Sequence, residues 1–314
     1  MASQISHTLL IYHSDSNTYQ RIISRRLPQL KIHPASRPKE ALGFVEETEI
    51  ILAWQIPDEL LKRAKRLQWF SSMGAGNEHL VKNPYLPKEV TLTKATVYGE
   101  MMAEYVFAYL LYFSRNVDKH LKDQRKKIWD RVKPGRLRGK VLGILGLGSV
   151  GKEIAKRGKQ FGMKVLALKR IPDPVEYVDQ VFGQDDLNKL IGSVDYLVDV
   201  LPLTAQTYHI LGGKELALLR EGTFLFSMGR AKTIDERALQ KVLLTKKIQA
   251  VFDVFEKEPL PPKSRFWGLK NVIITPHVSG ISIPEEISEE FVKNYEGWAK
   301  GEPLTNRVDR EKGY

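Results

Sequence analysis

The stretch Val141-Leu-Gly-Ile-Leu-Gly-Leu-Gly-Ser-Val-Gly151 decides the fold of this chain. It begins as a short apolar run typical of a buried strand and ends in G-x-G-x-x-G, directly before the helical pattern of residues 152–161. The first glycine permits a tight turn, the second lets a pyrophosphate approach the backbone, and the third allows close helix packing. Since helix N–H groups and the helix dipole face such an anion, the stretch predicts dinucleotide binding. The expected cofactor contacts are Gly146, Gly148, Ser149, Val150 and Gly151.

Short apolar, β-branched runs alternate with longer amphipathic stretches between residues 140 and 277. This alternation is typical of a parallel sheet with helices on both faces. Repeated βα units with right-handed crossovers produce a doubly wound, Rossmann-type sheet, so we expect an α/β fold. The expected strands are 140–146, 164–170, 180–182, 194–201, 222–228, 248–255 and 271–275.

A smaller alternating region precedes this one and indicates a second α/β domain. We expect a long helix from Gly99 to Trp129 between the two regions and a final helix from Pro284 that packs on the first region. Two domains follow: residues 1–98 with 282–314 as a discontinuous substrate-binding domain, and residues 99–281 as the dinucleotide-binding domain. The expected strands of the first domain are 8–12, 50–54, 67–72 and 90–93.

Composition excludes several classes of protein. The 314 residues are 42% hydrophobic and 27% charged, which is ordinary for a globular chain long enough for two domains. The longest apolar run, residues 105–113, is about half of what a membrane span needs, and the N-terminus lacks a secretory signal pattern. We therefore expect a cytoplasmic protein. With no cysteine, disulfides, Cys-ligated metals and thiol catalysis are excluded, and we expect no metal site.

The charge of the chain bears on its partners. Lys and Arg number 49 and Asp and Glu 37, a formal net charge of +12 that suits either nucleic acids or anionic small molecules. The sequence carries no zinc finger, RNP-type motif or basic heptad, and the basic run 119–140 is typical of a solvated face. A cofactor with phosphates is therefore the expected partner, with no nucleic acid and no membrane.

The residues after the second strand of the cofactor domain bear on which dinucleotide binds. NAD-binding units usually place an acidic residue about 20 positions beyond the glycine loop, where it holds the ribose 2′-hydroxyl. This chain has Lys169 and Arg170 there. A carboxylate repels a 2′-phosphate whereas Lys and Arg pair with it, so NADP(H) is the preferred cofactor and NAD(H) the alternative. The structural alternative is that both cations are solvated strand-end residues.

Several separate segments resemble the D-isomer-specific 2-hydroxyacid dehydrogenase family across nearly the whole chain. They are Arg138-Gly139-Lys140, Leu201-Pro202-Leu203-Thr204, Gly229-Arg230 with Ile234-Asp235, Asp253-Val254-Phe255 continuing to Glu258-Pro259-Leu260-Pro261, and Thr275-Pro276-His277. The resemblance implies a Rossmann cofactor domain, a smaller flavodoxin-like substrate domain, and Arg230, Glu258 and His277 as the catalytic triad. Trp267 and residues 275–280 are most similar to the glyoxylate/hydroxypyruvate reductase branch.

These three residue types suit the reduction of a 2-keto acid, which needs a hydride, a proton for the nascent alkoxide and an anchor for the carboxylate. His277 can supply the proton, and Glu258 as its partner would favour the imidazolium and fix the ring. Arg230 presents a planar fork to the carboxylate and carbonyl. Each residue also has a structural alternative, because a strand-end His is often bonded locally and Glu-Pro often marks a turn.

The resemblance implies further contacts around the substrate and the nicotinamide. Residues 72–77 match the family's substrate loop, whose backbone N–H groups hold the carboxylate as a glycine-rich nest would. The expected substrate contacts there are Met73, Gly74 and Ala75. Asp253 corresponds to the family residue at the nicotinamide carboxamide, with a turn cap as its structural alternative. The remaining expected cofactor contacts are Pro202, Met228 and Gly229. The chain departs from the family pattern around Arg230, with Ala231 after it and Ser227-Met228-Gly229 before it.

We therefore expect an oxidoreductase that reduces a small 2-keto acid, similar to glyoxylate or hydroxypyruvate, to the D-2-hydroxy acid with hydride from NAD(P)H. The alternative is a dinucleotide-sensing interaction protein, similar to the transcriptional corepressors that share this fold and retain the triad. A formate or phosphite dehydrogenase is disfavoured because formate enzymes normally pair the His with Gln, not Glu. A homodimer is expected because the apolar surface of the 99–129 helix exceeds what one chain can cover, and the family dimerises through this region.

Overall fold

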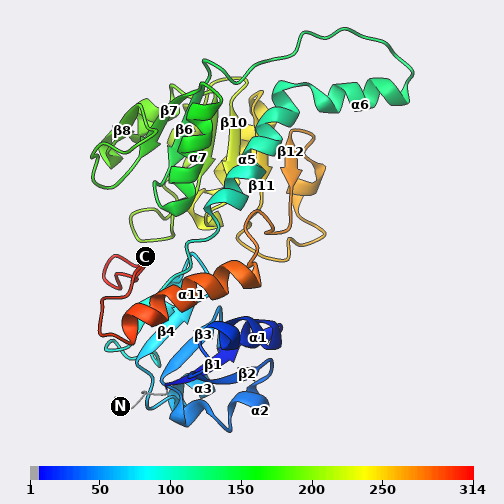
Figure 1. The fold of residues 1–314 in the computed structure, drawn as a ribbon. Helices are drawn as coiled ribbons and strands as arrows, with labels where there is room; N and C mark the ends of the chain where they lie inside the picture. Colours follow the sequence, from blue (N-terminus) through cyan, green and yellow to red (C-terminus); the bar gives the residue numbers. More distant parts are fainter. Residues whose placement is uncertain (1–6) are drawn as a thin grey trace. The chain divides into compact units, whose positions relative to one another are not determined.

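The computed structural model describes residues 7–314 and divides the chain into two compact units (Figure 1). Unit 1 comprises Met1–Tyr98 and Ile281–Tyr314, and unit 2 comprises Gly99–Gly280. The second division falls one residue before the expected one, between 280 and 281. In the described part of the chain, no helix is both long enough and apolar enough to cross a membrane.

Unit 2 is built on a seven-stranded parallel sheet with the order β12-β11-β10-β9-β6-β7-β8. The chain runs outward from β6 to β8 and then continues from β9 on the other side of β6, so the strand order reverses beside the glycine loop. The doubly wound fold expected from the sequence is thus confirmed. The strands are β6 (Val141–Leu145), β7 (Lys164–Leu168), β8 (Gln180–Phe182), β9 (Tyr196–Asp199), β10 (Phe224–Ser227), β11 (Gln249–Phe252) and β12 (Val272–Ile274).

Most of these strands are shorter than the apolar runs that predict them. The run 194–201, for example, contains β9, which pairs with β6 from Tyr196 to Asp199 only. Val194 and Leu201 lie outside the strand but are buried in the same core, so they contribute apolar residues without ladder hydrogen bonds. The short helical segments of unit 2 are α8 (Leu187–Ile191), α9 (Gly213–Ala217), η2 (Gln184–Asp186), η3 (Ala231–Thr233) and η4 (Arg265–Gly268).

The longer helices of unit 2 include one correction. In place of a single helix over 99–129, the chain forms α5 (Gly99–Ser114) and α6 (Val117–Arg125), followed by irregular residues. Asn116 between them adopts the left-handed conformation (φ 52°), which Asn tolerates better than most residues and which ends a right-handed helix. The apolar periodicity also stops there, because no residue of α6 is buried. The other long helices are α7 (Ser149–Gln160) and α10 (Glu236–Thr245).

Unit 1 is built on a five-stranded parallel sheet with the flavodoxin-like order β2-β1-β3-β4-β5. The sequence did not predict β2, because it contains Pro34 and only one buried residue; both features are tolerated at the edge of a sheet, where β2 lies. The strands are β1 (Thr8–Tyr12), β2 (Lys31–Ala35), β3 (Ile50–Ala53), β4 (Trp69–Ser72) and β5 (Thr91–Thr93), and the helical segments before residue 98 are α1 (Ser16–Arg26), α2 (Pro38–Ala41), η1 (Val45–Glu47), α3 (Asp58–Arg63) and α4 (Glu78–Val81).

The last helix, α11 (Pro284–Trp298), begins with Pro284 in its first turn, as its sequence predicts. It returns to the core of unit 1, where Phe291 stacks on Trp69 of β4 with ring centroids 5.1 Å apart. Burial of a large apolar side chain contributes about 1.5 to 3 kcal/mol. This contact explains why residues far apart in the sequence form one unit.

Candidate active site

The three glycines of the quoted loop have three different geometries. Gly146 directly follows β6 and has φ +100°, a conformation that L side chains rarely adopt. A Cβ on Gly151 would lie 1.9 Å from the carbonyl oxygen of Gly146, so only glycine lets the helix pack this close. Gly148 faces open space, with no atom within 4 Å of a hypothetical Cβ. The loop therefore leaves room for a phosphate group at the N-terminus of α7.

The first turn of α7 supplies donors for such an anion. Gly148 is its N-cap, and Ser149, Val150 and Gly151 are its first residues. The first N–H groups of a helix have no carbonyl partner within the helix, and the helix dipole favours negative charge there. The free N–H groups of this turn, the open space at Gly148 and the positive end of the helix dipole thus fit a dinucleotide pyrophosphate.

Lys169 and Arg170 follow β7 directly, one strand away from the glycine loop. The side chain of Lys169 forms an ion pair with Asp173, four residues further on. Asp173 is exposed, and its hydrogen bond from Lys169 lowers the pKa of its carboxyl group. An acid does therefore lie near this strand end, although the sequence places it after both cations. Arg170 is exposed.

The candidate catalytic residues follow three neighbouring strands. Arg230 lies three residues beyond β10, Glu258 follows β11, and His277 lies three residues beyond β12. Because these strands are parallel and adjacent, their carboxyl ends meet at one edge of the sheet of unit 2. Pro202 follows β9 at the same edge, and Met228 and Gly229 lie between β10 and Arg230.

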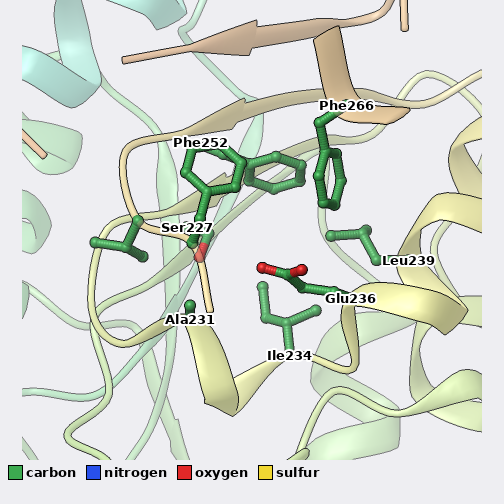
Figure 2. A pocket seen from close by; sticks show the side chains of 9 residues that line it. Ser227, Ala231, Ile234, Glu236, Leu239, Phe252 and Phe266 are labelled. Atoms are coloured by element: carbon green, nitrogen blue, oxygen red, sulfur yellow. The ribbon is translucent and has the colours of Figure 1, made fainter. Parts of the chain in front are cut away.

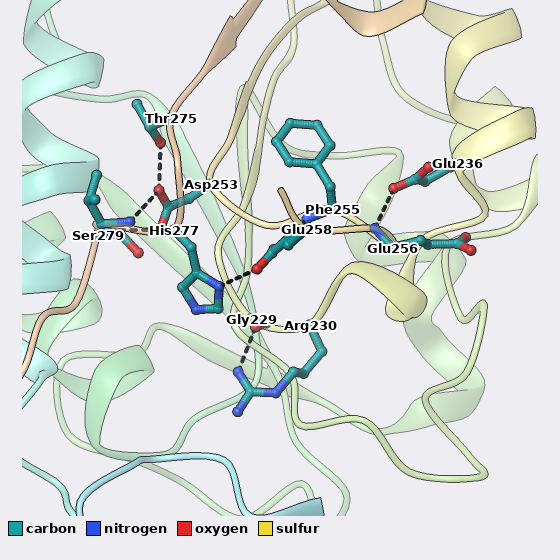
Figure 3. A network of polar contacts seen from close by, with 11 residues as sticks. Gly229, Arg230, Glu236, Asp253, Phe255, Glu256, Glu258, Thr275, His277 and Ser279 are labelled. Atoms are coloured by element: carbon teal, nitrogen blue, oxygen red, sulfur yellow. Dashed lines mark hydrogen bonds and ion pairs between the residues drawn. The ribbon is translucent and has the colours of Figure 1, made fainter. Parts of the chain in front are cut away.

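His277 and Glu258 are in direct contact (Figure 3). Their Nδ1 and Oε2 atoms lie 2.8 Å apart, and since an ionised carboxylate only accepts, Nδ1 carries the proton of this bond. The other ring nitrogen, Nε2, is then directed away from Glu258. Both side chains are exposed, 51% for His277 and 36% for Glu258, so an external group can reach the imidazole.

Arg230 extends from the loop after β10 in the same view (Figure 3). Its Nη1 donates to the carbonyl of Gly229 at 2.9 Å, which directs the guanidinium back along its own loop. Its backbone carbonyl accepts a hydrogen bond from the hydroxyl of Thr233 at 2.7 Å, so the loop is fixed at both ends of η3. The side chain itself is partly exposed.

Asp253 is fully buried directly after β11, and its carboxylate is occupied by the segment that carries His277. Oδ1 accepts from the hydroxyl of Thr275 at 2.6 Å and from the N–H of Val278 at 2.9 Å, while Oδ2 accepts from the N–H of Ser279 at 2.8 Å. Burial alone would raise the pKa of Asp253, but these hydrogen bonds outweigh it and lower the pKa. The observed contacts thus anchor the His277 segment; contact with a nicotinamide stays a prediction.

The anchoring accounts for an unusual backbone conformation at His277. This residue has φ 55°, in the left-handed region, where a non-glycine residue is uncommon. Its N–H donates to the carbonyl of Asp253 at 2.9 Å, and the carboxylate of Asp253 holds the next two residues. The left-handed conformation directs the imidazole to Glu258 while the backbone of this segment remains hydrogen-bonded to Asp253.

The candidate substrate loop of unit 1 follows β4. The N–H of Met73 donates to the carbonyl of Ala53 and that of Gly74 to the hydroxyl of Ser72. Within residues 7–314 no hydrogen bond uses the N–H of Ala75 or Gly76. The N–H groups of Ala75 and Gly76 are therefore candidates for binding an anion, and substrate contact by Met73, Gly74 and Ala75 stays a prediction.

Two features of this site escaped the sequence. Tyr105 of α5 bonds through its hydroxyl to Thr275, which in turn donates to Asp253. Burial raises the pKa of Tyr105, and its position in an apolar helix stripe gave no sign of a polar role. Glu236 of α10 accepts from a backbone N–H of the loop that carries Glu258. Within the described residues no group of three or more His, Asp or Glu side chains could hold a metal ion.

This fold and site together define a class, the nicotinamide dinucleotide-dependent dehydrogenases with a doubly wound cofactor domain. Residues 107–279 match the family model "D-isomer specific 2-hydroxyacid dehydrogenase, NAD binding domain". The chain belongs to the D-isomer specific 2-hydroxyacid dehydrogenase family. The family expected from the sequence is thereby confirmed.

Relatives extend this similarity over the whole chain. A family protein of known structure from Aeromonas salmonicida is 36% identical, covering 97% of this chain and 99% of its own, with a TM-score of 0.89. A family protein from Xanthobacter autotrophicus, solved in complex with NADPH and MES, is 30% identical. The match covers 98% of this chain and 100% of that one, with a TM-score of 0.91. A glyoxylate/hydroxypyruvate reductase A of Yersinia enterocolitica is 29% identical, covering 98% of this chain and 99% of its own.

The anchoring by Asp253 predicts the effect of Asp253→Asn. The amide of Asn would direct an N–H₂ group at one of the donors that the carboxylate now satisfies. A buried donor left without an acceptor costs about 1 to 3 kcal/mol, so we expect the free energy of unfolding to fall by that amount in urea titrations. The exposed Asp185→Asn is the control and should leave it unchanged.

The same substitution should change how the free energy of unfolding depends on pH in the acid range. Because the folded-state pKa of Asp253 lies below the ordinary Asp value of about 3.9, its ionised form stabilises the folded state above that pH. This contribution is lost as the pH falls through the folded-state pKa. Asp253→Asn should therefore lose less unfolding free energy than wild type between pH 5 and the acid transition. Equal losses in both proteins would contradict the anchoring role.

Proposed function

We propose that this protein reduces a small 2-keto acid, of the size of glyoxylate or hydroxypyruvate, to the D-2-hydroxy acid with NADPH as the preferred cofactor. The observation that carries the proposal is the contact between His277 and Glu258, at the edge of the sheet where Arg230 and the glycine loop also follow their strands. Family membership and the names of the relatives support the reaction type. In this proposal unit 2 binds the dinucleotide and unit 1 supplies the substrate loop.

His277 would deliver the proton. Its Nδ1–H is held by Glu258, so the ring has one orientation and Nε2 is the nitrogen left to face the substrate oxygen. Proton donation from Nε2 requires the imidazolium, whose positive charge Glu258 would face. The dinucleotide, when bound, supplies the hydride. The donated proton would neutralise the oxygen on which negative charge develops.

Arg230 and the loop of unit 1 would hold the substrate's carboxylate. A guanidinium presents two parallel N–H groups that match a carboxylate and can also polarise the neighbouring carbonyl. The N–H groups of Ala75 and Gly76 would supply further donors, as a backbone nest does for anions.

The preference for NADPH rests on Lys169 and Arg170. Both lie at the strand end where the adenosine ribose would be expected, and two cations suit a 2′-phosphate. Asp173 competes for Lys169 through its ion pair, so Lys169 must exchange partners when a phosphate binds. The relative from Xanthobacter autotrophicus was solved with NADPH, which supports this choice.

Expected contacts in unit 2 are proposed in the same way. Gly146, Gly148, Ser149, Val150 and Gly151 would hold the pyrophosphate. Pro202, Met228, Gly229 and Asp253 lie at the carboxyl ends of β9, β10 and β11, where the rest of a dinucleotide would pass.

His277→Ala and Arg230→Ala should fail in different ways. Loss of His277 removes the proton donor, so kcat for keto-acid reduction should fall by about 10² to 10⁴ with NADPH binding intact. Loss of Arg230 should raise KM for the keto acid and lower kcat as well, because the same fork binds the ground state and polarises the carbonyl. Steady-state kinetics with glyoxylate and hydroxypyruvate measure both.

The exposed Arg21→Ala on α1 is the control and should behave as wild type. Dinucleotide binding with no turnover of any 2-keto acid by the wild-type protein would contradict the enzymatic proposal.

Replacing Lys169 and Arg170 together by Ala should weaken NADPH binding by about 2 to 3 kcal/mol, because charge-assisted hydrogen bonds to the 2′-phosphate are lost. NADH binding, which involves no such phosphate, should change little. Asp173→Asn removes the competing carboxylate and should instead tighten NADPH binding. Calorimetric titrations with both dinucleotides test this, and a wild-type protein that binds NADH more tightly than NADPH would refute the assignment.

We also propose a homodimer that buries the arm formed by α6 and residues 126–132. In Figure 1 this arm extends away from the sheet of unit 2. No residue of α6 is buried, and Trp129 is 91% exposed, which is costly for so large an apolar ring. A hollow of about 640 Å³ lies along the arm, lined by His120, Asp123, Gln124, Lys127, Ile128, Trp129, Asp130, Arg131 and Val132. A second copy of this arm is the simplest cover, and a two-fold axis would make the contact isologous.

Sedimentation at micromolar concentration should therefore give a dimer for the wild type. Trp129→Ser with Leu121→Ser should shift it toward monomer, because both side chains are exposed and apolar. The exposed Leu244→Ser on α10, outside the arm, is the matched control and should leave the dimer intact. A monomeric wild type would exclude the proposal.

A further inference from the structure

A small, mostly apolar cavity lies in unit 2 beside the segments that follow β10 and β11, and its lining includes Ala231, Ile234 and Phe252 (Figure 2). Its volume is about 10 Å³, at the lower limit for a single water molecule, so it cannot hold a substrate. One carboxylate, that of Glu236, points into it (Figure 2). The lining residues also include Phe255 and Phe266.

Glu236 is the first residue of α10, and it reaches the loop after β11 through a single hydrogen bond. Its Oε1 accepts the backbone N–H of Glu256 at 2.8 Å (Figure 3). The preceding N–H, that of Phe255, donates to Oε1 of Glu258 at 2.9 Å. The other oxygen of Glu258 contacts His277 at 2.8 Å. Two consecutive backbone amides thus link Glu236 to the carboxylate that orients the imidazole.

The segment that Glu236 holds has little other anchorage. Phe255 is buried against Phe252 and Phe266, but residues 256–259 are exposed. From the other side, Nε2 of His209 lies 3.9 Å from Oε1 of Glu256, which is within ion-pair distance but too far for a hydrogen bond. The bond from Glu236 is therefore the contact that fixes the backbone where the exposed part begins.

A carboxylate is an expensive residue at this place. Burial raises the pKa of Glu236, the hydrogen bond from Glu256 N–H lowers it, and the charge of Glu256 raises it again, with a net rise. An apolar side chain of similar length would fill the space beside the phenylalanines without this cost. What the carboxylate adds is an acceptor for the N–H of Glu256.

We propose that Glu236 is a positioning residue that holds residues 255–258 so that Glu258 meets His277 in the orientation needed for proton delivery. The proposal rests on the proposed function for its effect on catalysis. Its effect on the loop does not depend on turnover, so the two can be tested separately.

The key variants are Glu236→Met and Glu236→Gln. Met keeps the length and suits the apolar cavity but accepts no N–H, whereas Gln keeps an accepting oxygen. Glu256→Ala is the matched control, because it removes a carboxylate from the same loop and retains the backbone N–H that Glu236 binds. We expect all three to fold, and Glu236→Met to melt at or above the wild-type temperature because it removes a half-buried charge from an apolar site.

In the kinetic arm, Glu236→Met should lower kcat for the keto acid by on the order of tenfold to a hundredfold, as misplacement of a reacting group does. KM for NADPH should stay within about twofold of wild type, and Glu236→Gln and Glu256→Ala should keep kcat within about threefold, because neither removes the acceptor or the N–H. Full activity in Glu236→Met would overturn the proposal. So would a Glu236→Gln variant as slow as Glu236→Met.

The structural arm follows the exchange of single backbone amides with deuterium by NMR. If Glu236→Met removed only its own hydrogen bond, deuterium exchange would become faster at the amide of Glu256 alone. If the whole loop shifted, exchange should also become faster at the amide of Phe255, whose acceptor is Glu258. Faster exchange at both amides in Glu236→Met, restored in Glu236→Gln, is the expected result, and an unchanged Phe255 would overturn the proposal. If wild type reduces no keto acid, the proposed function fails and this arm still decides the role of Glu236.

Discussion

Parallel strand pairing is the constraint on which the rest of this molecule depends. A parallel sheet places all carboxyl ends at one edge, and in unit 2 the strands β10, β11 and β12 are neighbours. Arg230 and His277, which lie 47 positions apart along the chain, therefore follow strands that are separated in the sheet by β11 alone. The same pairing brings the glycine loop after β6 and the cations after β7 to that edge. No contact between individual side chains could assemble these groups without it.

Carboxylates that accept backbone hydrogen bonds then fix the positions of the loops at this edge. Asp253 uses both carboxylate oxygens to hold residues 275–279, and the left-handed conformation of His277 persists because the surrounding bonds impose it. Glu236 acts in a similar way on the neighbouring loop. Asp253 is buried and accepts two backbone N–H groups, whereas Glu236 is half-buried and accepts one. Both carboxylates tie the segments that carry His277 and Glu258 to the body of unit 2.

Much of the fold could be predicted because its signals are local and strong. Apolar runs located the strands of unit 2. The runs are longer than the strands because buried residues such as Val194 lie just outside the hydrogen-bonded ladder. Where local signals were weak, prediction failed. The strand β2 was missed because an edge position tolerates Pro34, and the 99–129 helix was predicted too long because one left-handed residue, Asn116, divides it.

The sequence by itself determined the glycine loop, because its turn at Gly146 and its close helix packing at Gly151 require glycine at a fixed spacing. It also determined the residue types Arg230, Glu258 and His277, since these accompany family motifs that can be read without coordinates. Only the tertiary structure decided which partners complete them. Asp253 and the amide of Ser279 lie 26 positions apart, and Glu236 and the amide of Glu256 lie 20 apart. A backbone N–H has no residue-specific signature, so such bonds become visible only when packing has set the distance.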